Sequence, residues 1–264
     1  MDNDDKQIGR VLNRRDVLRL LGYSSAAFLA GCVPGVSEIL TDTPVPTSIL
    51  EATDTPLSTA TVVSSIPACV VRPELTEGPY FVDEKINRSD IRSDPSDGSV
   101  KDGLPLQLTF RVSQINNDCL PLEGATVDVW HCDALGVYSD ATDRSFNTVG
   151  QKFLRGYQVT NANGIAQFTT IYPGWYQGRT VHIHFKIRTE AAGGGTYDFT
   201  SQLFFDDAVS DMVYTQEPYV SKPGTRSPRN EGDNIFQQSG GQLILQLDQA
   251  TDGYSATFDI GLQI

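Results

Sequence analysis

Ala125-Thr126-Val127-Asp128-Val129-Trp130-His131 places apolar side chains at alternate positions, on Ala125, Val127 and Val129. Successive side chains of a strand point to opposite faces, so this stretch predicts a strand with one face in a core. Similar short runs, separated by turns of Gly, Asn and Asp, occupy residues 104–112, 164–171, 180–187, 197–205, 242–247 and 254–262. No window has a convincing period of 3.6 residues. The sequence therefore predicts an all-β domain, an antiparallel sandwich or an open barrel.

The overall composition is that of a globular protein with an acidic surface. The chain has 264 residues, of which 39% are apolar, which is enough to form a core. Lys and Arg number 20 and Asp and Glu number 33, a net charge of −13. This balance argues against nucleic-acid binding, which depends on basic contacts to phosphate. No apolar run approaches the ~20 residues of a membrane-spanning helix.

The N-terminal residues 1–31 have the features of an export signal. Arg14 and Arg15 stand just before a short apolar run at 20–29, as in twin-arginine signals. The run ends in Leu-Ala-Gly-Cys at 29–32, which resembles a lipobox, with cleavage before Cys32 and lipidation of its thiol. An amphipathic helix with a buried cysteine is the alternative. We expect an exported lipoprotein at the bacterial cell surface or in the periplasm, held to the membrane only through lipidated Cys32.

A low-complexity segment follows the predicted lipid anchor. Residues 33–66 contain twelve Ser and Thr and four Pro, with no aromatic residue, Lys or Arg. Such a composition cannot bury enough apolar surface to offset the entropy lost on ordering. We expect residues 32–66 to form a disordered tether behind the lipid, and residues 67–264 to form the folded domain.

The residues that carry chemistry gather in one strand and in the turn before it. Two of the three histidines of the chain, His182 and His184, are two residues apart and therefore share one face of the predicted strand. They are either two exposed histidines on a solvated face or a pair of metal ligands, and His131 is a candidate third ligand. The preceding Tyr-Pro-Gly-Trp-Tyr ends at Tyr176, whose phenolate would suit a hard trivalent ion.

Around these residues the sequence resembles the intradiol ring-cleavage dioxygenases, which open catechols between the two hydroxylated carbons with non-haem Fe(III). Five segments occur in the order of that family: Thr-Glu-Gly-Pro-Tyr-Phe at 76–81, the run 121–139, Phe-Leu-Arg-Gly at 153–156, Pro-Gly-Trp-Tyr at 173–176 and Arg-Thr-Val-His-Ile-His-Phe at 179–185. The resemblance extends from about Thr76 to the C-terminus and implies a β-sandwich.

The resemblance also implies a metal site with two tyrosines and two histidines. In this sequence the family's ligands fall on Tyr138, Tyr176, His182 and His184, which would hold one Fe(III) per chain. It further implies that Tyr176 leaves the metal as the diol binds, and that it then accepts a substrate proton as general base.

Four further residues receive roles from the same motifs. Arg179 is three residues before His182, so it must lie in a turn ahead of the regular strand to reach the same face; there it would stabilise negative charge on the substrate ring. Gln202 matches a family glutamine that orients a metal ligand, and Pro79 and Tyr80 match the segment that lines the substrate pocket.

The expected activity is O₂-dependent cleavage of catechol-type diols outside the cell to muconate-type dicarboxylates. Only five residues, 177–181, separate Tyr176 from His182, which predicts a more open site than in members with a longer connection. The signal and the tether stand where catechol dioxygenases have a helical dimerisation region, so we expect a monomer.

Two other classes of protein compete with this interpretation. The segment 121–127 also resembles the opening of transthyretin-like sandwich modules, which would make the chain a non-catalytic surface binding module. A zinc hydrolase could use His131, His182 and His184, although no carboxylate stands beside the histidine pair to serve as general base.

Three cysteines remain after lipidation of Cys32, so at most one intrachain disulfide forms among them. Cys132 ends the strand that leads towards Tyr138, and Cys119 precedes that strand. An extended segment from Glu77 would carry Cys69 roughly 26 Å from the pocket. We prefer the pair Cys69–Cys119, and a bend in the segment would favour Cys69–Cys132 instead.

Overall fold

The computed structural model describes residues 69–191 and 193–264. The predicted signal peptide, Cys32 and nearly all of the tether lie outside these residues. Among the residues that the structure describes, no helix is long and apolar enough to cross a membrane.

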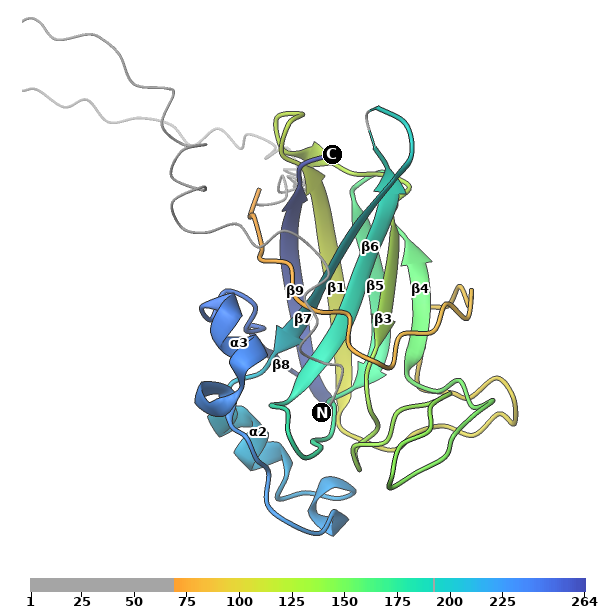
Figure 1. The fold of residues 1–264 in the computed structure, drawn as a ribbon, viewed down its shortest axis with the longest axis vertical. Coiled ribbons are helices and arrows are strands. Elements are labelled where there is room, and N and C mark those ends of the chain that lie inside the picture. Colours follow the sequence, from red (N-terminus) through yellow and green to blue (C-terminus); the bar gives the residue numbers. More distant parts are fainter. Residues whose placement is uncertain (1–68, 192) are drawn as a thin grey trace, which may run out of the picture. The chain divides into compact units, whose positions relative to one another are not determined.

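The domain consists of two packed β-sheets (Figure 1). Its strands are β1 (Pro105–Gln114), β2 (Leu120–Pro121), β3 (Thr126–Trp130), β4 (Arg155–Val159), β5 (Ile165–Ile171), β6 (His182–Glu190), β7 (Thr196–Phe204), β8 (Asp248–Ala250) and β9 (Gly253–Leu262). Two short helices, α2 (Asp207–Val213) and α3 (Asn234–Ser239), and the 3-10 turns Tyr219–Ser221 and Asn230–Gly232 lie between β7 and β8. One sheet has the order β2-β1-β9-β8 with β5 also paired to β1, and the other has the order β4-β3-β6-β7.

This architecture confirms the predicted all-β sandwich, with two differences in detail. β1 and β9 pair in parallel, although we expected antiparallel strands. A parallel pair needs a long crossover, and here the whole chain between the two strands provides it. The strand predicted at 242–247 is wrong: Ile244 makes one isolated bridge to Phe204, while Leu243 and Leu245 are buried without a ladder.

The core lies between the inner faces of the two sheets. In β1 the alternating residues Leu106, Leu108 and Phe110 are buried, and in β6 Ile183 and Phe185 are buried. The rings of Phe110 and Phe185 join the two layers, with centroids 5.2 Å apart. Since the side chains of a strand alternate, the histidines of β6 point to the outer face of its sheet.

The cysteines adopt the pairing that we preferred from the sequence. Cys69 and Cys119 form a disulfide between the start of the described chain and the turn that joins β1 to β2. Cys132, just after β3, is a free and buried thiol whose Sγ lies 3.4 Å from the carbonyl oxygen of Gly174. The disulfide and the free thiol therefore lie in different parts of the domain.

Candidate metal centre and active site

The pairing of β3, β6 and β7 assembles the base of the candidate site. His184 on β6 is paired with Trp130 on β3 and with Gln202 on β7, and paired residues share one face of a sheet. The Trp130 ring stacks on the His184 ring with centroids 5.0 Å apart. His182 and His184 are 2% and 1% exposed, so the alternative of two solvated histidines is wrong.

Two loops bring tyrosines over this face. Tyr138 lies between β3 and β4, and Tyr176 lies between β5 and β6. The loops pack backbone against backbone: a Cβ on Gly136 would lie 2.2 Å from the carbonyl oxygen of Trp175, and one on Gly174 would lie 2.4 Å from that of Asp133. Glycine is therefore required at both contacts, and it fixes the approach of the two tyrosines.

Four donor atoms from these elements converge on one point. The Nε2 atom of His182 lies 3.0 Å from Nε2 of His184, 3.2 Å from the hydroxyl of Tyr176 and 3.4 Å from the hydroxyl of Tyr138. The Nδ1–H of His182 donates to the carbonyl of Thr180 at 2.7 Å, so Nε2 presents a lone pair to the group. Spacings of about 3 Å are those of neighbouring ligands around a metal with bonds of about 2.1 Å.

Burial sets the protonation states of the donor groups in this site. Burial lowers the pKa of His182 and of His184 well below the usual value, so both imidazoles are neutral, as metal binding requires. Burial raises the pKa of Tyr138 well above the usual value, so a phenolate there needs a neighbouring positive charge. No cluster of three or more His, Cys, Asp or Glu occurs within the described ranges, and the two tyrosines complete this donor set instead. The residues fit Fe(III).

Arg179 lies in the turn ahead of β6, as predicted, and is firmly held there. Its Nε donates to Asp233 at 2.9 Å and its Nη2 donates to the side-chain oxygen of Gln202 at 2.6 Å. The amide nitrogen of Gln202 donates in turn to the carbonyl of Thr76 at 2.9 Å. Gln202 thus connects the Arg179 guanidinium to β7, beside His184 on the same face of the sheet.

Asp233 is a partner that the sequence analysis missed. One of its carboxylate oxygens caps α3 by accepting from the amides of Ile235 and Phe236, and the other accepts from Arg179 and from the amide of Thr180. The sequence signal for a helix cap is present at Asp233, but nothing in the sequence shows which arginine it faces.

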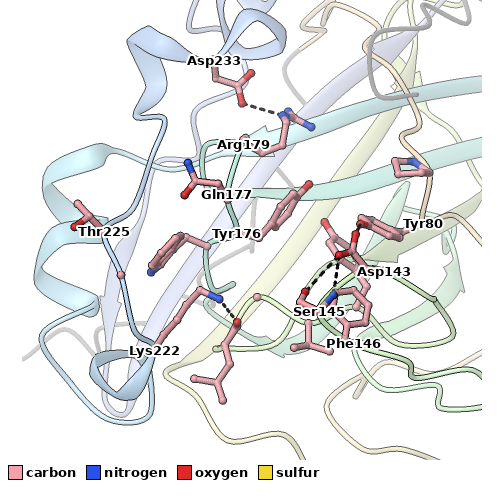
Figure 2. Close-up of a pocket in the computed structure, with 18 of the residues that line it drawn as sticks. Tyr80, Asp143, Ser145, Phe146, Tyr176, Gln177, Arg179, Lys222, Thr225 and Asp233 are labelled. Atoms are coloured by element: carbon pink, nitrogen blue, oxygen red, sulfur yellow. Dashed lines mark hydrogen bonds and ion pairs between the residues drawn. The ribbon is translucent and has the colours of Figure 1, made fainter. Parts of the chain in front are cut away.

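A cleft of about 970 Å³ opens above the converging donors. Pro79, Tyr80, Tyr138, Tyr176 and Arg179 all line it, as Figure 2 shows for the labelled residues. The Tyr80 ring stacks on the Tyr138 ring with centroids 4.4 Å apart. Pro79 and Tyr80, which the resemblance assigns to the substrate pocket, therefore lie in the wall of this cleft.

Arg155 is a second residue whose role the sequence analysis missed, although its motif was noted. The guanidinium is buried and donates to the Ser139 hydroxyl at 2.7 Å, to the Tyr80 carbonyl at 3.2 Å and to the Ser139 carbonyl. It therefore ties the segment that carries Tyr80 to the segment that carries Tyr138, and positions the two stacked rings.

His131 does not belong to the site. Its Nδ1–H donates to the carbonyl of Cys132 at 2.8 Å, and its Nε2 accepts from the hydroxyl of Thr170 at 2.6 Å. Both ring nitrogens are engaged in the interior, so the zinc hydrolase built on His131, His182 and His184 is excluded by the structure.

The burial of His131 makes the stability of the domain dependent on pH. Burial lowers the pKa of His131 from 6.5 to about 4, so the unfolded chain takes up the proton first. The contribution of neutral, buried His131 to the free energy of unfolding is therefore complete above about pH 6.5, and it is lost as the pH falls towards 4. Between pH 7.5 and pH 4 the wild type should lose about 3 kcal/mol of unfolding free energy more than His131→Gln does. Denaturant titrations of both proteins at the two pH values measure the difference, and equal losses would contradict it.

Comparison with known proteins identifies the class to which this fold and donor set belong. The sequence model of the family described as Dioxygenase matches residues 76–263. The chain belongs to the intradiol ring-cleavage dioxygenase family.

Individual relatives show how far the similarity extends. The intradiol ring-cleavage dioxygenase from Tetranychus urticae is 34% identical, with a TM-score of 0.61, covering 74% of this chain and 94% of that one. The dioxygenase domain of a dioxygenase–carbohydrate-binding protein fusion from Streptomyces sp. SirexAA-E is 30% identical, with a TM-score of 0.52 and coverages of 74% and 99%. Catechol 1,2-dioxygenase 1 of Acinetobacter lwoffii is 27% identical over 164 residues, 51% of this chain and 49% of that protein. The chain thus spans about half the length of the curated relatives it matches.

Proposed function

We propose that this protein is a non-haem Fe(III) dioxygenase that cleaves catechol-type diols between the two hydroxylated carbons, giving muconate-type dicarboxylates. The main support for this proposal is the convergence of four donor atoms. The hydroxyls of Tyr138 and Tyr176 and the Nε2 atom of His184 all lie within 3.4 Å of His182 Nε2. The name of the Acinetobacter lwoffii relative, a catechol 1,2-dioxygenase, supports the same substrate class.

Each residue around the donor atoms would have a separate role in the proposed reaction. Bound Fe(III) would activate the diol towards O₂. Tyr176 lines the cleft. As a phenolate it would accept a proton from a diol hydroxyl and so act as general base, becoming a neutral tyrosine. Arg179, fixed by Asp233 and Gln202, would stabilise negative charge that develops on the ring. The stacked Tyr80 and Tyr138 rings offer an aromatic wall to the substrate.

The colour and metal content of the purified protein test this proposal. An iron-bound tyrosinate gives intense visible absorption, and we expect it together with about one iron per chain. A colourless protein that binds zinc or no metal when supplied with iron would contradict the proposed centre. The transthyretin-like binding module, which accounts for the strands alone, predicts that colourless result.

We further propose that the protein is exported and anchored through Cys32, as a monomer that acts on diols outside the cell. The twin-arginine and lipobox patterns of residues 14–32 support the export and the anchor.

Cys32→Ser should release the protein from the membrane fraction without changing its activity, because the tether separates the anchor from the chemistry. Fractionation of expressing cells and assay of both fractions measure this. Retention of the variant in membranes after washing without detergent would count against the lipobox.

A further inference from the structure

The cleft is larger than one aromatic ring requires. Clefts of about 300–1,000 Å³ accommodate drug-sized ligands, and this one is at the upper end of that range, at about 970 Å³. It extends from Tyr80 and Phe146 on one side to Lys222 and Thr225 on the other (Figure 2). A diol bound at the four donors would therefore leave room for a substituent in the rest of the cleft.

The charged groups along the cleft differ in how they are paired. Arg179 forms an ion pair with Asp233 at 2.9 Å. Asp143, on the opposite wall, accepts a hydrogen bond from the Tyr80 hydroxyl at 2.9 Å. Lys222 has no carboxylate within ion-pair distance among residues 69–191 and 193–264, and its ammonium donates to the backbone carbonyl of Leu135. It is therefore the cation of the described cleft lining without an anionic partner.

Packing holds the Lys222 ammonium in the wall of the cleft. The nitrogen lies 4.8 Å from the centroid of the Trp175 ring, and Trp175 directly precedes Tyr176. Figure 2 shows the Lys222 side chain on one side of Tyr176 and the Arg179–Asp233 pair on the other. An ammonium has three donor hydrogens, so the one bond to Leu135 leaves two for a ligand.

The partly buried position of Lys222 favours an anionic ligand. Burial lowers the pKa of Lys222, because removing its charge from water costs free energy that the charge of Asp133, which lies beyond ion-pair distance, offsets only in part. A carboxylate bound to the ammonium would offset this cost and form a charge-assisted hydrogen bond.

We propose that Lys222 binds an acidic substituent of the substrate, so that the preferred diols are catechols with a short side chain ending in a carboxylate. This inference rests on the proposed function, since it assumes that the diol end binds at the four donors. Lys222 is in this account a specificity-determining residue.

Two substrates of nearly equal size test the inference. We would measure kcat/KM for 3-(3,4-dihydroxyphenyl)propanoate and for its methyl ester, which lacks the charge, with wild type, Lys222→Met and Lys222→Arg. Wild type should prefer the acid by about tenfold or more, which is the effect of a charge-assisted hydrogen bond. The acid-to-ester ratio should fall towards one in Lys222→Met and be retained largely in Lys222→Arg, whatever happens to the absolute rates. Lys85→Met, an exposed lysine outside the cleft, controls for net charge.

The outcomes separate this inference from the proposed function. Equal kcat/KM values for acid and ester in wild type would overturn the role of Lys222 while leaving ring cleavage in place. A ratio that does not change in Lys222→Met, or that changes equally in Lys85→Met, would overturn it as well. No cleavage of either compound or of catechol by the iron-loaded wild type would instead contradict the proposed function.

Discussion

His184→Ala should fold and yet retain no iron, with no visible absorption and ring cleavage below detection. The substitution removes one of four donors from a site in which His184 Nε2 lies 3.0 Å from His182 Nε2. The remaining three donors cannot hold the ion in the same environment. Tyr138→Phe is a milder change, because the ring can keep its stack on Tyr80 while only the hydroxyl is lost. It should abolish most of the absorption as well.

His131→Gln is the matched control for these variants. It also alters a buried histidine, but both ring nitrogens of His131 bond to groups outside the metal site. It should keep its iron and its colour at neutral pH. Iron analysis, visible spectra and circular dichroism of the three variants decide the matter. Normal iron, colour and activity in both His184→Ala and Tyr138→Phe would remove these residues from the metal site.

Arg179→Lys should lower kcat by about 10²- to 10³-fold while the protein keeps its iron, in line with the loss of one preorganised donor at an active site. Lysine retains the positive charge, but it lacks the fork that reaches Asp233 and Gln202 at the same time. The charge next to the substrate ring would lose its fixed position.

Arg226→Lys provides the comparison for Arg179→Lys. Arg226 is also a largely buried arginine in ion pairs, with Asp207 and Asp211, but it does not line the cleft. Steady-state assays with catechol at saturating concentration, normalised to iron content, should show a much smaller effect for Arg226→Lys. Equal losses in the two variants would mean that the effect of Arg179→Lys comes from general destabilisation.

The sequence predicted much of the sandwich because its strands have one apolar face. The alternation at 125–131 and 180–187 falls on β3 and β6, because the face towards the other sheet takes the apolar residues Val127, Val129, Ile183 and Phe185. The opposite face of these strands is also buried, but by polar and aromatic residues. The segment 242–247 shows a similar apolar pattern, but its only pairing in the described residues is one isolated bridge between Ile244 and Phe204. Leu243 and Leu245 are therefore buried in a segment without regular strand structure. The helices α2 and α3 are too short to show a helical period.

The site was predicted from motifs, and its supporting contacts were not. The family pattern placed two tyrosines and two histidines, and the structure brings all four together. The contact of Asp233 with Arg179 joins residues 54 positions apart, and Arg155 reaches Tyr80 across 75 positions. Such partners depend on how loops pack over a sheet, which the local pattern of a single sequence does not encode.

Identification of the product formed from catechol tests the central claim most directly. The purified, iron-loaded protein would be incubated with catechol under O₂ with measured oxygen uptake, and the product analysed by mass spectrometry and by its absorption spectrum. Two tyrosines and two histidines as ligands predict cleavage between the hydroxylated carbons, giving a muconate-type dicarboxylate with one O₂ consumed per diol. A semialdehyde, formed by cleavage outside the two hydroxyls, would contradict this account.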